Sequence, residues 1–498
     1  MNVAEPRVAI AIIASAALSG CMVGPDFVRP LTPQVQRYTE TPMAEATVAT
    51  PGLGGAAQRF IPGSDLPGQW WTLFRSPPLD DLIRQALADS PTLAAAEAAL
   101  REANENLAAG KGELLYPAVD AKASATLQKI SGASLGEPNL GTSLFTLYNA
   151  NVNVSYALDV FGGARREVEG LQALTDYQAF LLGGAHLTLT SNIVTTAIRE
   201  AALRAQVRST IEIIAALERQ LSTVERQFAL GAVSRSDVLA QRTQLEQTRA
   251  TLPPLERDLA RTRHQLAVLA GRLPSLAALP EFELESLTLP QEIPLSVPSA
   301  LVRQRPDILA SEALLHQASA EVGVATANLY PKITLTGSFG GASLKAGDLF
   351  AGPSVWSIGA GLLQPLFHGG ALTAKRRAAI DAYDQAAAQY RQTVLLAFQN
   401  VADTLRTLDD DARTLQAQAS AEAVAREALA LAERQFRLGA VSYLTLLNAQ
   451  RQYHLARIAL TRAQADRYAD TAALFQALGG GWWQPQAAAE LPASSKPD

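Results

Sequence analysis

Four segments of the chain alternate apolar and polar residues with a period of two, which is typical of β-strands. The first runs from Val119 to Leu127, where Val, Ala and Leu alternate with Asp, Lys, Ser and Thr. The others are residues 151–159, 332–339 and 356–362, the last alternating more weakly. Each is roughly nine to eleven residues long, which is the length that a tilted strand needs to cross a bilayer.

The commoner structure for such alternation is a soluble sheet with one solvated face. Here the flanking sequence favours the membrane. Residues 131–142 and 343–353 are polar, Gly-containing stretches that separate the first two and the last two predicted strands, and long helical sequences leave the other ends. We therefore predict two hairpins that point the same way.

Most of the remaining sequence predicts helices. A stretch rich in Ala, Leu, Gln and Arg follows Gly162 and runs to Phe228, which would be roughly 100 Å long if unbroken. Gly183 and Gly184 are expected to interrupt it, because paired glycines weaken a helix. In the returning helix, leucines recur at intervals of seven, which indicates lengthwise packing with a supercoil; these are Leu245, Leu252, Leu259 and Leu266.

The second half of the chain repeats the first. Residues 225–234 recur as residues 433–442 with one difference, Ala229 against Arg437. The order helix, strand, loop, strand, long helix, turn, long helix is the same in both halves, so we predict a tandem repeat of roughly 210 residues. Pro253 and Pro254 are expected to bend the returning helix of the first repeat only, because the second repeat has Thr461 and Arg462 there.

The N-terminus indicates export. Val8 to Leu18 is a short apolar stretch after Arg7, too short to span a bilayer and typical of a secretory signal. It is followed by Ser19, Gly20 and Cys21, the only cysteine of the chain, so we predict cleavage before Cys21 and lipid attachment to it. A single cysteine excludes an internal disulfide.

Composition and motifs exclude other classes of protein. The net charge of −5 and the lack of a Lys or Arg cluster argue against nucleic acid as a partner. No catalytic or metal-binding motif is present, and we expect no enzyme activity and no cofactor besides the lipid. We interpret each of the five histidines as a helix-surface or lumen-facing residue; they are His186, His264, His316, His368 and His454.

Strands that sit in lipid must close their edges, because an unpaired backbone group in hydrocarbon is costly. Two chains would give eight strands and a filled barrel, whereas three would give twelve strands and leave a lumen. A conduit therefore requires a homotrimer. Its twelve strands would join a barrel of twelve long helices.

Several motifs together resemble the TolC family of outer-membrane efflux proteins, specifically its NodT-like lipoprotein branch. They are the cleavage site at Cys21, Leu-Tyr-Pro at 115–117 and 329–331, Arg305-Pro306-Asp307, the two Leu-Gly-Ala-Val-Ser turns and Gly479 to Trp482. The resemblance implies a trimeric 12-stranded β-barrel in the outer membrane, joined to a 12-helix α-barrel in the periplasm. It also implies two partners, a periplasmic adaptor and an inner-membrane pump of the resistance-nodulation-division type.

Six segments follow from the repeat and the resemblance. We predict a lipoprotein signal peptide (1–20), a lipid-anchored extended arm (21–78), a first repeat (79–271), an equatorial linker (272–298), a second repeat (299–479) and a C-terminal tail (480–498), which we expect to be disordered after Trp483.

The turns between the long helices are the predicted periplasmic tips, and the resemblance implies that adaptor hairpins dock there. The tip residues are Phe228, Leu230, Gly231, Ser234, Phe436, Leu438, Gly439 and Ser442. Gly231 and Gly439 also fit ordinary helix-ending glycines.

The resemblance further implies that residues just beyond the tips narrow the closed channel. These aperture residues are Asp237, Leu444, Thr445 and Asn448. Relatives carry acidic residues near the second tip, where this chain has Thr445 and Asn448. Asp237 matches a position that pairs to hold the tips shut, or it is a solvated surface acid.

Two alternatives remain open. One is an outer-membrane channel for protein secretion, whose family members usually lack the lipid-attachment sequence. The other is a periplasmic coiled-coil structural lipoprotein, which would leave the four alternating strands unexplained.

Overall fold

The computed structural model describes residues 22–131, 141–352 and 354–483. The predicted signal peptide, Cys21 and the tail after Trp483 lie outside the described residues. The described chain divides into two compact units. The first contains the described parts of Met1–Pro30, Ala99–Ala179 and Ala310–Arg391, and the second those of Leu31–Ala98, Phe180–Leu309 and Gln392–Asp498.

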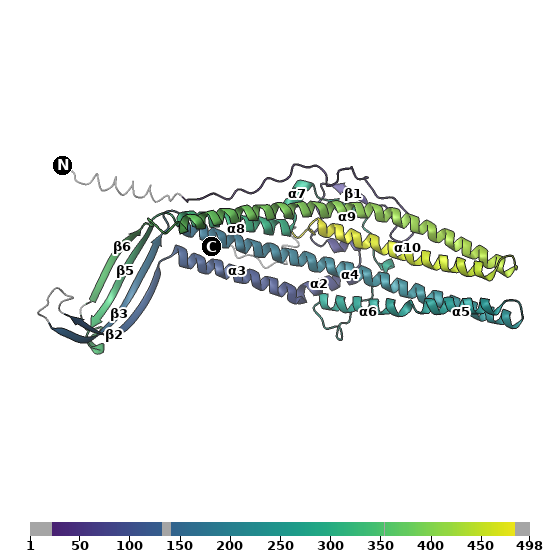
Figure 1. The fold of residues 1–498 in the computed structure, drawn as a ribbon, viewed down its shortest axis with the longest axis horizontal. Helices are drawn as coiled ribbons and strands as arrows, with labels where there is room; N and C mark the ends of the chain where they lie inside the picture. The colour runs from purple at the N-terminus through teal and green to yellow at the C-terminus, as the bar shows by residue number, and fades with distance from the viewer. Residues whose placement is uncertain (1–21, 132–140, 353, 484–498) are drawn as a thin grey trace. The chain divides into compact units, whose positions relative to one another are not determined.

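The first unit contains an antiparallel sheet in the order β2-β3-β5-β6, as Figure 1 shows. Its strands are β2 (Ala118–Ser131), β3 (Thr142–Leu158), β5 (Lys332–Ser343) and β6 (Ser354–Leu363). All four predicted strands are present, and β2 and β3 extend beyond the alternating segments, to 14 and 17 residues.

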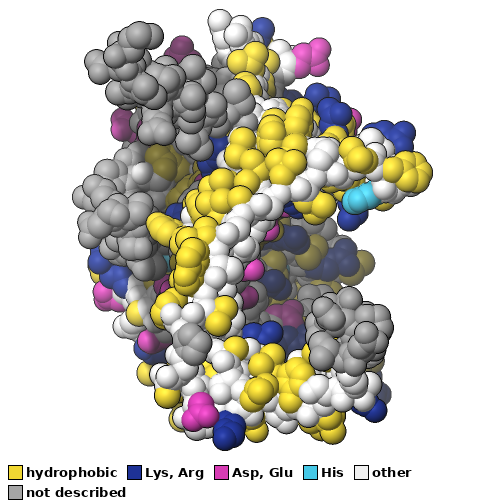
Figure 2. Space-filling view, turned by 90° about the vertical axis from the view of Figure 1, so that its left-hand side faces the viewer, with side chains coloured by type: hydrophobic (Ala, Val, Ile, Leu, Met, Phe, Trp, Pro, Cys, Tyr) yellow, Lys and Arg dark blue, Asp and Glu magenta, His cyan; other side chains and the backbone are white. Residues whose placement is uncertain are grey.

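The register of the sheet separates apolar from polar side chains. Phe339 lies opposite Val152 on one side and Trp356 on the other, and all three belong to the apolar positions of the alternation. The next row pairs Ser338 with Asn153 and with Ser357, and the Ser338 and Ser357 hydroxyls are 2.8 Å apart. Because directly paired residues point to the same face, the sheet has one apolar and one polar face. Figure 2, viewed from the side where Figure 1 shows the strands, shows hydrophobic side chains gathered in patches beside polar ones.

Helices account for most of the described chain. Their bounds are α2 (Pro77–Asp89), α3 (Pro91–Leu115), α4 (Gly163–Ala229), α5 (Arg235–Arg249), α6 (Leu252–Leu269), α7 (Pro298–Gln304), α8 (Pro306–Ala327), α9 (Ala371–Arg437) and α10 (Tyr443–Ala477). Short 3₁₀ helices are η1 (Trp70–Phe74), η3 (Leu284–Ser286) and η4 (Ala346–Asp348). In the described residues no helix is both long enough and apolar enough to cross a membrane.

The predicted interruption of α4 at Gly183 and Gly184 is wrong, because the helix is continuous over 67 residues. Packing explains Gly183 better than flexibility does. A Cβ atom on Gly183 would lie 3.1 Å from the Trp482 ring, so the missing side chain lets the indole sit against the helix. The Trp482 indole nitrogen also donates to the Gln304 carbonyl at 2.6 Å.

The prediction for Pro253 and Pro254 is confirmed. The returning helix of the first repeat breaks between α5 and α6, and the prolines lie in the first turn of α6, where no intrahelical donor is needed. The equivalent α10 is one unbroken helix of 35 residues. The two repeats therefore differ in the second unit.

The predicted extended arm contains a strand that the alternation did not reveal. In the second unit β1 (Arg59–Pro62) pairs in parallel with β4 (Glu292–Leu295). Next to this pair the fully buried Arg467 of α10 donates to the carbonyls of Gly54 and Ala56 at 2.7 and 3.2 Å. Residues 54–62 of the predicted arm are thus held within the second unit by backbone pairing and by a buried guanidinium.

Candidate functional site

The first predicted tip is a tight turn between α4 and α5. Gly231 has a φ of 74°, a left-handed conformation that favours glycine. The Ala232 amide donates to the Gln227 carbonyl at 2.8 Å, and the Gly231 amide donates to the Phe228 carbonyl at 2.9 Å. These two bonds form a Schellman motif, which ends α4 and satisfies its last carbonyls.

The second predicted tip repeats this geometry between α9 and α10. Gly439 has a φ of 70°, and the Ala440 amide donates to the Gln435 carbonyl at 2.9 Å. The repeated Leu-Gly-Ala-Val-Ser sequence therefore has one structural meaning in both places. Figure 1 shows the paired helices α4 with α5 and α9 with α10 lying side by side up to these turns.

Serine begins the returning helix at both turns, but only the first has a complete capping box. The Ser234 hydroxyl accepts from the Asp237 amide at 3.3 Å, and the Asp237 carboxylate accepts from the Ser234 amide at 2.9 Å. Ser442 accepts from the Thr445 amide at 3.3 Å, and no carboxylate returns the bond. The sequence Ser-Arg-Ser-Asp carries the capping-box signal, so this role of Asp237 could have been recognised beforehand.

Both turns expose a leucine and differ in their phenylalanines. The side chains of Leu230 and Leu438 are 84% and 83% exposed. Phe228 is exposed as well, whereas Phe436 packs edge-on against Tyr443 with ring centroids 5.5 Å apart.

A small core lies beneath the turns and holds the two helical hairpins together. Its buried members are Val224, Ala432, Tyr443 and Leu446. The Tyr443 hydroxyl donates to the Gln241 side-chain oxygen, and the Gln241 amide group donates to the Leu217 carbonyl at 3.1 Å. Burial raises the pKa of Tyr443, so this phenol stays a neutral donor.

The remaining aperture residues lie on the first two turns of α10. Leu444, Thr445 and Asn448 are all exposed in the single chain, and Leu444 and Asn448 are one helical turn apart. Asp237 is half-buried and engaged in its capping box. The structure thus brings these residues together near the tips.

Carboxylates gather around Arg467 in the second unit, a feature that the sequence patterns did not reveal. Burial, together with the neighbouring Asp470 and Asp466 carboxylates, raises the pKa of Asp411 to about 8, while Arg467 acts in the opposite direction. Asp411 is therefore largely protonated at neutral pH. The three acids come from α9 and α10, so their charge affects how these helices pack.

The interpretation of the five histidines as surface or lumen residues agrees with the exposure of His264 and His368, whereas His186, His316 and His454 are half-buried. His454 is half-buried, and burial lowers its pKa to about 4. His316 stacks on Phe27 and contacts Glu169. Among the described residues no group of three or more His, Cys, Asp or Glu side chains is placed to hold a metal ion.

Comparison with known proteins agrees with the fold. The family model for outer membrane efflux proteins matches residues 82–272 and 297–480. The pyoverdine export outer membrane protein OpmQ of Pseudomonas aeruginosa is 32% identical over 421 residues, covering 83% of this chain and 87% of the relative. The toluene efflux pump outer membrane protein TtgC of Pseudomonas putida is 30% identical, covering 96% of each chain.

Solved channel structures superpose on nearly the whole chain. The outer-membrane channel OprN aligns with a TM-score of 0.82 and 26% identity, over 93% of this chain and 100% of that one. CusC aligns with a TM-score of 0.80 and 25% identity over the same shares. The predicted family, fold class, channel function and outer-membrane location are confirmed. The chain belongs to the outer membrane efflux protein family and is an outer-membrane channel protein of an efflux pump.

Proposed function

We propose that three copies of this chain close one conduit through the outer membrane and that the conduit passes substrates without changing them. The observation that carries this proposal is the four-stranded sheet. Within the described chain β2 and β6 each pair with one neighbour only, so each leaves an edge open. Pairing β6 of one copy with β2 of the next closes these edges, and twelve strands leave a lumen that eight would not.

The two faces of the sheet support the same arrangement. A membrane barrel places apolar side chains against lipid and polar ones in its lumen. The row containing Val152, Phe339 and Trp356 would face lipid, and the row containing Ser338 and Ser357 would face the lumen. No residue is needed for a chemical step on the substrate.

The tips are the proposed docking surface for a periplasmic adaptor. Exposed Leu230 and Leu438 lie at the two turns, each held by a rigid Schellman motif. An exposed apolar side chain on a fixed backbone suits a packing contact with a partner helix. We propose that the adaptor links this channel to an inner-membrane pump of the resistance-nodulation-division type, as the family resemblance implies.

In this proposal the inner-membrane pump, and not the channel, selects the exported substrate. Similar proteins are named for pyoverdine export, toluene efflux and cation efflux, which are chemically unlike. A conduit shared by such relatives has little need for a specific binding site. We also propose that lipid attached to Cys21 anchors the chain in the outer membrane.

Neighbouring residues on opposite faces of β5 offer a direct test. In the variants Ser338→Cys and Phe339→Cys, the purified protein is reconstituted in a planar bilayer and exposed to a charged, water-soluble thiol reagent. We expect a stable conductance that the reagent changes in Ser338→Cys and leaves unchanged in Phe339→Cys. A protein without conductance, or a conductance altered only through Phe339→Cys, would contradict the proposal.

A further inference from the structure

We infer that residues 22–29 form a docking arm, and that the contact surface of α4 and α8 holds this arm so as to fix where a lipid on Cys21 leaves the protein. This surface, the groove, consists of Arg166, Glu169, Glu312, His316 and Gly323. The inference rests on the proposed lipid attachment. All of the residues involved belong to the first unit. The groove, and not the lipid, would determine the path of the arm.

The start of the arm lies against backbone that has no side chains to separate it. The Val23 amide donates to the Phe161 carbonyl at 3.1 Å. A Cβ atom on Gly24 would lie 2.6 Å from the Gly323 Cα atom, and one on Gly162 would lie 2.7 Å from Met22 Cγ. Such close approach requires glycine on the groove, so the contact depends on this register of the arm.

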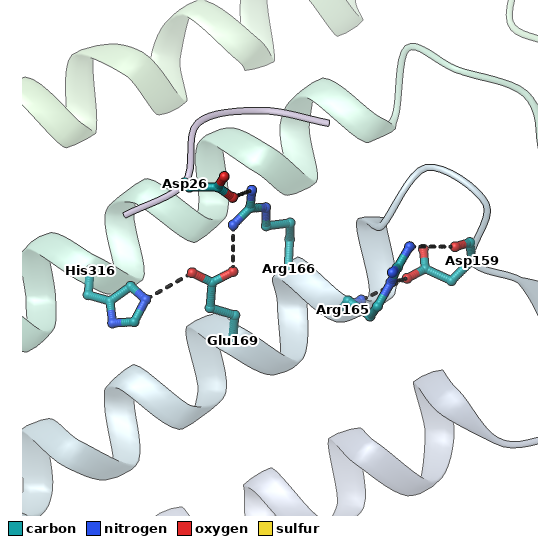
Figure 3. Close-up of polar contacts among 6 residues, drawn as sticks. All are labelled: Asp26, Asp159, Arg165, Arg166, Glu169 and His316. Atoms are coloured by element: carbon teal, nitrogen blue, oxygen red, sulfur yellow. Dashed lines mark hydrogen bonds and ion pairs between the residues drawn. The ribbon is translucent and has the colours of Figure 1, made fainter. Parts of the chain in front are cut away.

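A buried arginine binds the middle of the arm. Arg166, in the first turn of α4, is 2% exposed and donates to the Asp26 carboxylate at 2.5 Å and to Glu169 at 2.7 Å, as Figure 3 shows. Asp26 itself is 86% exposed. If the arm left the groove, the Arg166 guanidinium would keep only one of its two carboxylate partners, Glu169. Because a guanidinium–carboxylate bond is charge-assisted and strong, its loss makes the undocked arm less favourable.

Glu169 extends the network to an aromatic contact. Its second oxygen lies 2.9 Å from the His316 ring nitrogen Nε2 (Figure 3). The His316 ring stacks on Phe27 with centroids 4.2 Å apart and an angle of 15° between the planes. The position of Phe27 thus depends on α8 and, through Glu169, on α4.

A second ion pair fixes the end of the arm. The Arg29 guanidinium donates to Glu312 of α8 at 2.5 Å, and the Glu312 side chain is 10% exposed. Glu312, His316 and Gly323 are four and seven residues apart on α8, which places them along one face of that helix. The arm therefore follows α8 over several turns.

Docking of the arm restricts the position of a lipid on Cys21. Cys21 directly precedes Met22, which packs at Gly162 between β3 and α4. With the arm docked, a lipid on Cys21 is restricted to about one residue from the junction of strand and helix. A free segment of the same arm could extend by roughly 3.3–3.6 Å per residue, and the anchor would be a loose tether.

Chymotrypsin cleavage after Phe27 measures docking in the full-length, membrane-extracted protein, because a stacked Phe27 must leave the groove before it is cut. We expect Arg166→Met and His316→Ala to increase the rate of this cleavage by at least about tenfold. The matched control is Arg165→Met, because Arg165 bonds to the Asp159 side chain and carbonyl at 3.1 Å and not to the arm (Figure 3). This control should cleave at the wild-type rate.

A second variant, Cys21→Ser exported with a non-lipoprotein signal peptide, carries no lipid. It therefore shows whether the groove alone holds the arm. Protection of Phe27 equal to wild type would support the inference, and cleavage as fast as in Arg166→Met would overturn it. The mass of the N-terminal peptide reports the lipid separately. An unmodified Cys21 would overturn both the proposed lipid attachment and the inference that the groove positions a lipid. The channel function would not be affected by that result, because the bilayer conductance tests it separately.

Discussion

One residue, Asp411 of α9, is expected to make the stability of the folded chain depend on pH. The pKa of Asp411 is raised from 3.8 to about 8, so the folded chain retains a proton that the unfolded chain loses near pH 4. Folding stability therefore falls as the pH rises from about 4 to about 8 and is then unaffected by this group. The groups that face it are Asp466, Asp470 and Arg467, all on α10.

We expect Asp411→Asn to flatten this dependence, because the amide resembles the protonated acid. The measurement is the thermal unfolding midpoint between pH 5 and pH 8.5, compared with Asp410→Asn, a change at the neighbouring acid that pairs with Arg413. The midpoint of wild type should fall over this range and that of Asp411→Asn should fall less. If the midpoint fell equally with pH in wild type and Asp411→Asn, the pKa of Asp411 would not be raised in the folded chain.

Substitutions at two adjacent glycines of α4 are expected to change the stability of the chain in opposite directions. A Cβ atom on Gly184 would meet only Pro306, at 3.9 Å, whereas one on Gly183 already lies 3.1 Å from Trp482. We expect Gly184→Ala to stabilise the chain by about 0.5–1 kcal/mol through helix propensity. Gly183→Leu should lower the unfolding midpoint, because a larger side chain must displace the indole. Stabilisation by both changes would contradict the packing role of Gly183.

At the scale of elements, the sequence predicted structure well wherever a pattern was long. The alternation located all four strands of the larger sheet, because each has a period of two over many residues. The repeat located both turns, because the same ten-residue sequence occurs at each of them with one difference. It failed for β1 and β4, since four-residue strands carry no measurable period and their pairing joins residues 59–62 to residues 292–295. It also failed at Gly183 and Gly184, where α4 continues unbroken and Gly183 packs against Trp482, a residue far away in the chain.

The candidate site shows the same limit. The glycines of both turns and the serine caps follow from the repeated motif. The arm network does not, because Asp26, Arg166 and His316 are far apart in the chain and each is unremarkable alone. No local pattern reports a contact between residues separated by 140 positions.

The exposed leucines give a prediction for the tips. We expect Leu230→Ser with Leu438→Ser to abolish export in cells while leaving assembly and bilayer conductance intact, because these side chains have no packing role in the chain. Leu239→Ser, an exposed position on α5 outside the turn, is the control. Minimum inhibitory concentrations of exported compounds measure the loss. Export at the wild-type level in the double variant would exclude the turns as the docking surface.

At the scale of the whole molecule, the proposal depends on chain count. One chain supplies a four-stranded sheet with an apolar and a polar face and with open edges at β2 and β6. Open edges in lipid leave backbone groups unpaired, which is costly enough to require closure by further copies. Three copies satisfy both the edges and the need for a lumen.

The native mass of detergent-extracted protein tests this claim most directly, because one spectrum reports the number of chains and the modification of the first residue. We predict a complex of three chains, each beginning at an acylated Cys21. A soluble, unmodified monomer would contradict the account of a lipid-anchored trimeric channel.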